Sequence, residues 1–466
     1  MNAVLIIFAR LPVFGQVKTR LERDLGPERT LQYYRRLVAQ LAQTVHRLRQ
    51  NTAIPVAVFY AGDTTQAKDT ASDREALADL QGILQADHWT RQINGTLGER
   101  MCHAFTTVAE RHPGKSITLC GTDIPQLNDT DLLAAFQALT LAPAVLLPVH
   151  DGGYGLIGLS ATALSEPDGL PAIFALQRWS HPGVLPEQIE HLESAGYAPV
   201  LLKPVADIDT FDDALRYHAH RPELLQGLFG DIRVVIPVWN EAENLRDLIQ
   251  TLQQLPWLRE VIIADNDSSD NSRVLARTLG ARVTRCRERG YGATCLAALA
   301  DIRKRGGCDI VLFMDGDGAD APQSYWSVIA PVLQGRYNFC LGYRDPQTAE
   351  RGALQAHQRF GNWLATTLIR LVYRYRFLDL GPLRAIQWDA LESLCMDDRN
   401  YGWTIQMQIR AILAGLSMLE LAVPYRRRQY GQGKVTSSLR ASLRAGMVIL
   451  GSVWQERRWQ PDTDCD

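Results

Sequence analysis

The sequence lacks several features that place a chain in a special class. Its eight cysteines form no Cys-x-x-Cys pair and its ten histidines form no His-x-x-x-His pair, which argues against a zinc site. Lysine and arginine total 49 against 51 aspartate and glutamate, so no overall basic excess indicates a nucleic-acid partner. So few cysteines in a long chain predict reduced, mostly buried thiols and a cytoplasmic protein.

Long apolar runs are missing as well. Residues 1–8 are apolar but have no basic segment before them, so we interpret them as a buried first strand and not as a signal peptide. The next apolar run, residues 445–454, is about half of the roughly 20 residues that a membrane-spanning helix needs. The sequence therefore predicts no transmembrane segment, and it leaves open a peripheral position at the inner face of a membrane.

What the chain does have is length and apolar content for more than one core. It has 466 residues, 46% of them hydrophobic, and domains commonly have roughly 100–200 residues. Short apolar runs alternate with helical periodicity, for example at 28–50 and 241–254, which is typical of a mostly parallel α/β sheet. The predicted strands are residues 4–8, 55–60, 116–120, 144–148 and 199–203, then 233–237, 260–264, 282–285, 309–314 and 338–342. We expect two domains, residues 1–227 and 228–466.

An acidic motif follows the strand predicted at 309–314. Asp315 and Asp317 are two residues apart, so both side chains can face one cleft. Paired hard oxygen ligands suit Mg²⁺ or Mn²⁺ carrying a diphosphate. Because an Asp-x-Asp is also common on solvated turns, the motif needs support from the rest of the half.

Other strand ends in the second half supply that support. Glycines in such loops let the backbone approach a phosphate or a ribose. The segments concerned are Pro237-Val-Trp-Asn240-Glu241, Asp265-Asn266-Asp267, Arg289-Gly290-Tyr, Tyr343-Arg344-Asp345, His357-Gln-Arg359, Asp379-Leu-Gly381-Pro, Trp403-Thr404-Ile-Gln406 and Gly433-Lys434. Taken together, residues 231–455 resemble glycosyltransferase family 2, the inverting nucleotide-sugar enzymes, and within it the polyprenyl-phosphate and dolichyl-phosphate mannosyltransferase branch.

The resemblance implies a role for each matching position. The nucleotide pocket would be formed by Pro237, Asn240, Glu241, Asp265 and Gly290. The catalytic set would be Asp317, Arg344, Arg359 and Lys434, with Mg²⁺ or Mn²⁺ held by Asp315 and Asp317. The two arginines would bind the acceptor phosphate or the donor diphosphate, because planar guanidinium groups suit oxyanions. The implied reaction is a metal-dependent, inverting transfer of a sugar from a nucleotide-diphosphate donor to an acceptor, expected to be a polyprenyl phosphate.

Three features of this half depart from the pattern or leave it open. Gln406 stands where relatives usually have Glu, and an amide cannot be a general base. A phosphate acceptor is already ionised near neutral pH, so the change favours either such an acceptor or a weakened enzyme. Gly433 stands where Ser commonly precedes the lysine. Residues 363–375 mix apolar and basic side chains at helical spacing, which fits either an amphipathic helix at a lipid surface or an ordinary packed helix.

The first half carries a second set of polar strand ends. Lys18 and Arg20 lie in a strand-turn-helix segment, where they attract phosphate or serve as ordinary surface cations. Acidic and glycine residues follow later strands: Asp123, then Asp151-Gly152-Gly153, then Asp207 and Asp209. As a set, residues 1–215 resemble the glycosyltransferase-A-type family described as arsenosugar biosynthesis glycosyltransferase. They are more distantly similar to guanylyl- and cytidylyl-transferases of the nucleotide-diphospho-sugar transferase superfamily.

This second resemblance implies metal binding at Asp123, a second carboxylate from Asp207 or Asp209, and phosphate binding by Lys18 and Arg20. Asp151, Gly152 and Gly153 would shape a substrate pocket. Three alternatives stay open for this half: a nucleotidyltransferase that makes the donor, a domain that only binds nucleotide sugar, or one that only docks to its neighbour. The predicted fold class is α/β, with two tandem glycosyltransferase-A-like, Rossmann-like domains whose mixed sheets are mostly parallel.

Overall fold

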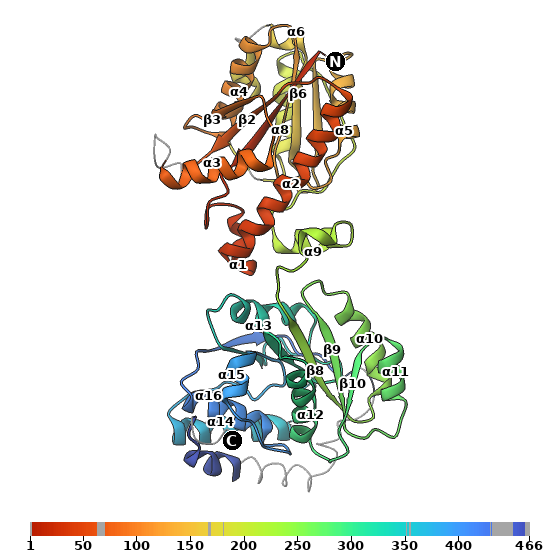
Figure 1. Cartoon of the computed structure of the whole chain (residues 1–466), viewed down its shortest axis with the longest axis vertical. Helices are drawn as coiled ribbons and strands as arrows, with labels where there is room; N and C mark the ends of the chain where they lie inside the picture. The colour runs from red at the N-terminus through yellow and green to blue at the C-terminus, as the bar shows by residue number, and fades with distance from the viewer. Residues whose placement is uncertain are drawn as a thin grey trace. The chain divides into compact units, whose positions relative to one another are not determined.

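The computed structural model describes residues 2–62, 70–165, 169–179, 181–350, 352–353, 356–428, 430 and 451–461. The chain forms two compact units, Met1–Leu225 and Gln226–Asp466, and each is considered by itself (Figure 1). Each unit is an α/β fold around one mixed, mostly parallel sheet of seven strands, so the predicted fold class is confirmed. Among the helices that the structure describes, none is long and apolar enough to cross a membrane.

The N-terminal unit holds the strands β1 (Ala3–Arg10), β2 (Val56–Ala61), β3 (His88–Arg91), β4 (Ser116–Cys120), β5 (Ala144–Pro148), β6 (Tyr154–Leu159) and β7 (Pro199–Leu201). Its helices are α1 (Thr19–Leu25), α2 (Pro27–Asn51), α3 (Ala71–Ile83), α4 (Leu97–Arg111), α5 (Asp129–Ala138), α6 (Ala161–Leu164), α7 (Leu170–Ile173), α8 (Val184–Ser194), α9 (Phe211–His218) and the 3-10 helix η2 (Pro222–Leu224). In the sheet order β3-β2-β1-β4-β6-β5-β7, β6 runs antiparallel to both of its neighbours.

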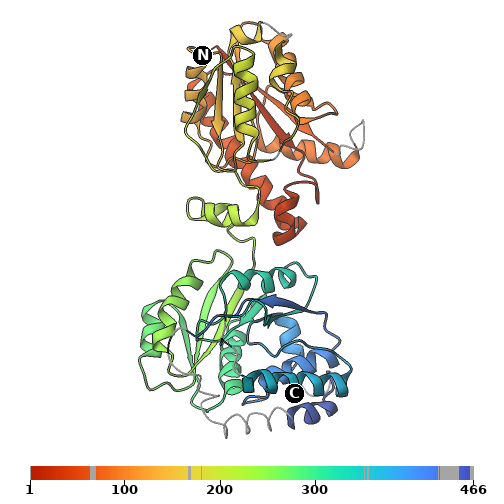
Figure 2. The ribbon, with the colours of Figure 1, turned by 180° about the vertical axis from the view of Figure 1, so that it is seen from behind.

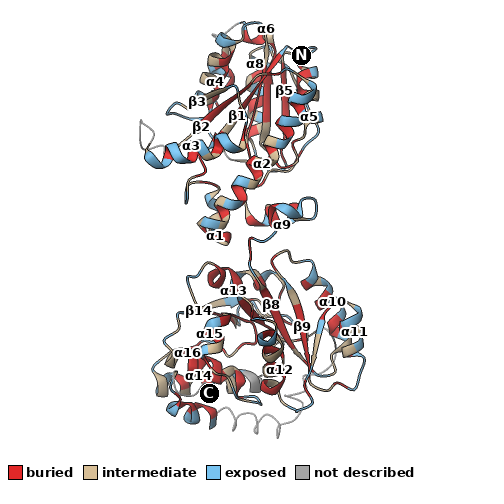
Figure 3. Ribbon diagram, viewed as in Figure 1, coloured by how far each residue is buried: buried red, intermediate tan, exposed pale blue. Residues whose placement is uncertain are grey.

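Helices cover both faces of this sheet. Leu5 and Ile7 of β1 pack with α2 and α5, whereas Val4 and Ile6 pack with α4 and α7 on the opposite face. Figure 3 shows the result as buried strands between helices whose outer faces are exposed. A strand buried on both faces is apolar at every position, which is why the sequence already indicated β1.

The C-terminal unit holds the strands β8 (Ile232–Val238), β9 (Glu260–Asp265), β10 (Arg282–Arg285), β11 (Ile310–Phe313), β12 (Phe339–Arg344), β13 (Arg384–Gln387) and β14 (Met418–Val423). Its helices are α10 (Ala242–Gln253), α11 (Ser272–Thr278), α12 (Tyr291–Lys304), α13 (Gln323–Leu333), α14 (Ala356–Tyr373), α15 (Trp388–Ser393), α16 (Trp403–Leu413) and the 3-10 helix η3 (Glu456–Arg458). The strand order β10-β9-β8-β11-β13-β12-β14, with β13 antiparallel, repeats that of the first unit strand for strand. Both units therefore share one topology, and the acidic motifs predicted after β4 and β11 follow equivalent fourth strands. Figure 2 shows the two units from behind.

Two expectations need correction. Four strands were not predicted, β3, β6, β13 and β14, because they are short, half-buried or rich in glycine and so show no continuous apolar run. Cys395 is disulfide-bonded, so the prediction of thiols throughout is wrong at that position. The free thiols among the described residues are Cys102, Cys120, Cys286, Cys295, Cys308 and Cys340.

Candidate functional sites in the two units

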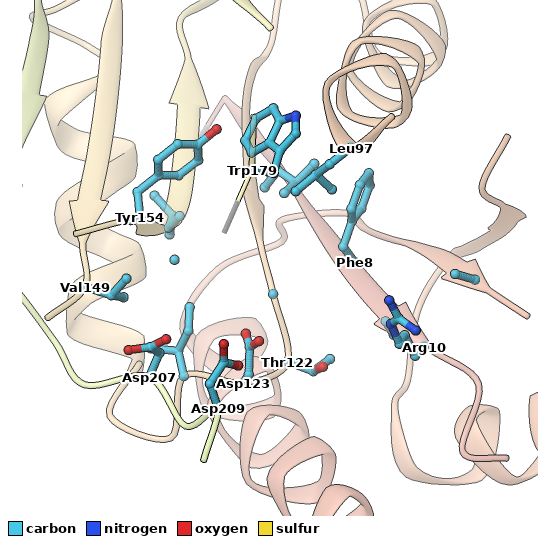
Figure 4. A pocket seen from close by; sticks show the side chains of 18 of the residues that line it. Phe8, Arg10, Leu97, Thr122, Asp123, Val149, Tyr154, Trp179, Asp207 and Asp209 are labelled. Atoms are coloured by element: carbon cyan, nitrogen blue, oxygen red, sulfur yellow. The ribbon is translucent and has the colours of Figure 1, made fainter. Parts of the chain in front are cut away.

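A cavity of ≈520 Å³ lies at the carboxyl ends of the central strands of the N-terminal unit. Figure 4 shows three apolar side chains, Phe8, Leu97 and Trp179, across the cavity from the carboxylates of Asp123, Asp207 and Asp209. The cavity lining also includes Arg10, Lys18, Arg20, Arg100, Asp151 and Gly153. Most residues that the sequence assigned to a site in this half therefore meet at one cavity.

Lys18 is the central cation of this site, but it is already saturated. Its Nζ donates hydrogen bonds to Asp123 Oδ2 at 3.0 Å, to Asp209 Oδ1 at 3.0 Å and to the carbonyl oxygen of Ile208 at 2.6 Å. Burial opposes the charge, yet the two carboxylates raise the pKa of Lys18, and Lys18 in turn lowers the pKa of Asp123. With three acceptors for three N–H bonds, Lys18 holds carboxylates here and presents no spare donor to a phosphate. Asp123, expected to hold a metal, faces this ammonium.

Asp151, Asp207 and Asp209 form the carboxylate group that could hold a cation in this unit. One oxygen from each lies within 4.8 Å of the others. Burial and the nearby Asp151 carboxylate raise the pKa of Asp207 to about 6. Arg20 Nη1 lies 3.2 Å from Asp209 Oδ2, so the predicted phosphate ligand Arg20 also binds a carboxylate. The sequence indicated a second carboxylate from Asp207 or Asp209, but it assigned Asp151 to the substrate pocket and did not indicate this group of three.

The glycines after β5 shape the turn that carries Asp151. Gly152 has φ of +91°, and a Cβ there would lie 2.3 Å from the carbonyl oxygen of Pro182. The N–H of Gly153 donates to Asp151 Oδ1 at 2.8 Å. Gly153 lines the cavity, and the expected role of both glycines in shaping a substrate pocket stays a prediction.

In the C-terminal unit, acidic residues gather directly after β11. Burial, and then the charge of Asp317, raise the pKa of Asp315 to about 7. Asp317 accepts a hydrogen bond from the N–H of Ala319 at 3.0 Å, and its Oδ2 lies 3.8 Å from Arg428 Nη1. Asp320 is buried, and neither of its oxygens accepts a hydrogen bond from any residue that the structure describes. The site thus concentrates carboxylates, and the arginines that act on them are Arg344, Arg384 and Arg428.

The loops after β8 and β9 are bonded to each other beside this cluster. Asn240, with φ of 55°, accepts hydrogen bonds at Oδ1 from the N–H groups of Ser269 at 2.7 Å and Asp270 at 3.3 Å. The N–H of Glu241 donates to Ser272 Oγ at 2.9 Å. The predicted nucleotide residues Asn240 and Glu241 therefore also fix the loops, while Pro237 lies within β8.

Arg428 ties Glu241 to the acidic cluster. Its guanidinium forms an ion pair with Glu241 and also approaches Asp317. The sequence pattern did not indicate this bridge. Arg428, which follows β14, therefore links the loops after β8, β11 and β14.

Asp265 is fully buried at the end of β9. Its Oδ2 accepts from the N–H of Ser268 at 3.2 Å and lies 3.2 Å from Arg273 Nε. Its Oδ1 is buried and has no hydrogen-bond partner within the described part of the chain. Because the side chain of Asp265 is fully buried, a contact with a base or a ribose stays a prediction.

Gly290 has a packing reason of its own. Its φ is +152°, and a Cβ there would lie 2.0 Å from the carbonyl oxygen of Arg399. The N–H groups of Gly292 and Ala293 donate to the carbonyl oxygens of Asn400 at 3.1 Å and Arg399 at 2.9 Å. The loop at 398–400 therefore covers the first turn of α12, and a nucleotide contact by Gly290 stays a prediction.

A second cavity, of ≈390 Å³, lies beside β12 and α14, and its lining brings together the predicted Arg344 and Arg359 with Asn362 and Asp379. Arg344 Nε and Nη2 donate to the two carboxylate oxygens of Asp379, both at 2.7 Å. Burial opposes this charge, but the Asp379 carboxylate raises the pKa of Arg344. Asp379 thus fixes the plane of the Arg344 guanidinium, a role that the sequence did not indicate. Lys434 and Gly433 lie outside the described residues.

Gln406 has a structural role that explains why an amide stands there. Its buried Oε1 accepts the N–H groups of Asp397 at 3.1 Å and Asp398 at 2.9 Å. Its Nε2 donates to Asp397 Oδ1 and to Glu456 Oε1, both at 2.7 Å. Arg410 Nε binds the other oxygen of Glu456 at 2.7 Å. A glutamate at 406 would set a third carboxylate against two others, so the amide suits this network.

Comparisons with known proteins agree with this division. Residues 44–181 match the family described as uncharacterized protein conserved in bacteria (DUF2064), and residues 233–391 match glycosyl transferase family 2. An uncharacterized glycosyltransferase of Mycobacterium tuberculosis is 29% identical over 215 residues, covering 46% of this chain and 94% of its own. The undecaprenyl-phosphate mannosyltransferase of Micrococcus luteus is 23% identical over 223 residues, covering 45% and 88%. The polyprenol monophosphomannose synthase of Mycolicibacterium smegmatis is 25% identical over 223 residues, covering 44% and 81%.

Solved structures were compared as well. Glucosyl-3-phosphoglycerate synthase from Mycobacterium tuberculosis is 20% identical, with a TM-score of 0.39, and the match covers 50% of this chain and 82% of that one. The two halves of the chain thus match DUF2064 and glycosyltransferase family 2 respectively, and the chain is a glycosyltransferase enzyme.

Proposed function

We propose that the C-terminal unit transfers a sugar, with inversion, from a nucleotide-diphosphate donor to a polyprenyl phosphate. The observation that carries this proposal is the proximity of the carboxylates after β11 to the arginine-lined cavity. Arg344 lines that cavity and is also among the charges that act on Asp315. A donor diphosphate needs a cation partner, which the carboxylates would hold, and an acceptor phosphate needs arginines. The donor part and the acceptor part of such a site are therefore neighbours. The relatives named for polyprenol and undecaprenyl phosphate support the choice of acceptor.

A divalent cation fits the carboxylates after β11. Their oxygens are the hard ligands that Mg²⁺ and Mn²⁺ prefer, and the buried carboxylate oxygens of Asp320 have no hydrogen-bond partner among the described residues. Asp315 and Asp317 would hold Mg²⁺ or Mn²⁺. When bound, the cation would neutralise the charge that builds on the leaving nucleotide diphosphate.

The remaining residues would bind and orient the substrates. The nucleotide would lie against Pro237, Asn240, Glu241, Asp265 and Gly290, with Lys434 as a further cation from the C-terminal loop. Arg344, held by Asp379, and Arg359 would place the acceptor phosphate for attack on the face of the sugar opposite the leaving group. Because that phosphate is already ionised, the reaction needs no strong base, which agrees with the engagement of Gln406 in its network.

A transfer assay tests this proposal. Full-length protein is incubated with Mg²⁺ or Mn²⁺, a panel of nucleotide sugars and extracted membrane lipids, and mass spectrometry detects glycosylated lipids. Asp317→Asn should abolish transfer while the melting temperature stays close to wild type. Asp247→Asn, which changes an exposed carboxylate on α10 of the same unit, is the matched control and should retain transfer. Transfer by Asp317→Asn at the wild-type rate would overturn the assigned role.

The N-terminal unit has a second candidate function, favoured by its cavity. A cavity of ≈520 Å³ with aromatic, cationic and acidic walls suits a nucleotide sugar better than it suits a purely docking domain. Pyrophosphate release from nucleoside triphosphates and sugar 1-phosphates separates nucleotidyl transfer from binding alone. The assay uses full-length Asp317→Asn protein so that the second unit is silent. Release that is lost in Asp151→Asn would identify a nucleotidyltransferase that supplies the donor.

A further inference from the structure

Helix α14 has two unlike faces. Ala365 and Ile369 are fully buried and pack on the core of the C-terminal unit, where the helix runs beside α16 (Figure 3). On the outer face Phe360 is 61% exposed, Trp363 60% and Leu371 72%. The packed-helix interpretation therefore describes one face only, and the outer face presents large apolar side chains to solvent at helical spacing.

The same segment carries an uncompensated positive charge. Residues 351–378 contain five arginines and no aspartate or glutamate. Arg359, Arg370, Arg374 and Arg376 are exposed, and within the described ranges none of these four forms an ion pair. A face that combines exposed aromatic side chains with unpaired arginines is complementary to the interface of an anionic bilayer, where the hydrocarbon region meets the negatively charged headgroups.

This face continues into the arginine-lined cavity. Arg359 and Asn362 on α14, and Leu378 just beyond it, all line that cavity. The rings of Phe360 and Trp363, 5.8 Å apart, lie next to Arg359 along the helix. An amphiphile whose phosphate entered the cavity would therefore place its hydrocarbon chain toward the apolar side of α14.

We propose that the outer face of α14, defined by Phe360, Trp363, Arg370 and Leu371, docks the protein on an anionic phospholipid bilayer together with Arg374, which directly follows the helix. Docking itself stands on the exposed side chains and the charge, and only its purpose rests on the proposed lipid-phosphate acceptor. A bilayer is favoured over an acidic protein because the exposed aromatic side chains of the helix lie between arginines near both of its ends, Arg359 and Arg370. Insertion buries the aromatics while the arginines reach the headgroups.

Sedimentation of full-length protein with vesicles tests the proposal. The protein should sediment with vesicles rich in phosphatidylglycerol and much less with pure phosphatidylcholine vesicles. The double variant Phe360→Ser with Trp363→Ser should weaken binding by more than about tenfold, because two large apolar side chains lose their burial. Val274→Ser is the matched control, since Val274 is 65% exposed on α11 of the same unit, and it should bind as wild type does. Circular dichroism and melting verify that each variant is folded.

The charged residues give a second, independent measurement. Arg370→Gln with Arg374→Gln should weaken binding to phosphatidylglycerol vesicles by about tenfold or more, since each surface cation contributes about 1 kcal/mol near an anionic leaflet. Binding should also fall as salt rises. Wild-type protein that stays in the supernatant with anionic vesicles would overturn the proposal. So would serine variants that sediment as wild type does, or that change only self-association in sedimentation velocity.

Failure of docking and failure of the proposed reaction can be told apart. Transfer to a short, water-soluble prenyl phosphate does not require a membrane, so the serine variants should retain it while losing transfer to polyprenyl phosphate in vesicles. Absence of transfer to both acceptors by wild-type protein that still binds vesicles would contradict the reaction and leave docking supported. Transfer to both acceptors by protein that does not bind vesicles would contradict docking alone.

Discussion

Lys18 and Asp123 form an ion pair of 3.0 Å that joins the loops after the first and fourth strands of the N-terminal unit. The same ammonium lies 3.0 Å from Asp209, in the loop after the seventh strand. One cation from the first loop is therefore held by carboxylates from the fourth and seventh loops.

The C-terminal unit joins its equivalent loops with the opposite arrangement of charge. There the cation is Arg428, after the seventh strand β14, and the carboxylates are Glu241, after the first strand, and Asp317, after the fourth. Only the position after the fourth strand holds a carboxylate in both units, Asp123 in one and Asp317 in the other. We infer that both units need a charge bridge across these three loops, and that in the N-terminal unit Lys18 neutralises the very carboxylate that its counterpart would offer to a metal.

Replacing Lys18 by methionine should therefore destabilise the N-terminal unit. The change leaves Asp123 and Asp209 facing each other without their shared cation, at an expected cost of about 2 kcal/mol in the free energy of unfolding, less than for a fully buried pair because both carboxylates are partly exposed. Urea unfolding measures the loss. Arg20→Met, which removes the exposed partner of Asp209, should cost less than about 1 kcal/mol. Equal costs for the two variants would contradict the central role of Lys18.

Asp207 should make the N-terminal unit less stable as pH rises from about 4 to about 6. Burial and Asp151 raise its pKa to about 6 in the folded state, whereas an unfolded aspartate titrates near about 3.9. Between these values the folded state binds more protons, so stability is greatest below the unfolded pKa and falls as pH rises through the folded one. Asp207→Asn removes that loss. Its unfolding free energy relative to wild type should grow from pH 4 to pH 6 and then level off.

Urea titrations of both proteins across this range check the expectation. The exposed Asp212→Asn controls for the loss of a nearby surface carboxylate. A difference between Asp207→Asn and wild type that does not change with pH would contradict the role of burial and Asp151.

Gln406→Glu should destabilise the C-terminal unit rather than restore a catalytic base. The new carboxylate would lose two donated hydrogen bonds and lie within reach of Asp397 and Glu456, at an expected cost of about 2–3 kcal/mol. Adding Glu456→Gln should recover part of the loss, because it removes one of the repelling charges. Thermal melting of the single and double variants measures both effects. A Gln406→Glu protein that melts as wild type does and transfers sugar faster would contradict this account.

The sequence allowed the fold class and most of the strands to be predicted, because β1, β8 and β11 are buried on both faces and are apolar apart from Arg10 and Arg233. It also gave the residues of the sites, since polar strand ends such as Asp315 and Asp123 stand out against apolar runs. It could not indicate which groups converge. The bridges from Lys18 to Asp209, from Arg428 to Glu241 and from Gln406 to Glu456 join residues far apart in the chain, and nothing local distinguishes them from surface charges.

Asp379→Asn should raise the KM for the acceptor without a comparable change in the KM for the donor. Asp379 holds Arg344 through two parallel hydrogen bonds of 2.7 Å, and an asparagine can accept only one of them, so the guanidinium loses its fixed plane. If Arg344 binds the acceptor phosphate as proposed, the lost orientation should cost about tenfold in acceptor KM, about 1.4 kcal/mol. Arg344→Lys, which keeps the charge but not the fork, should produce a similar change. Steady-state kinetics with each substrate varied in turn separates the two constants, and an effect confined to the donor would assign Arg344 to the diphosphate instead.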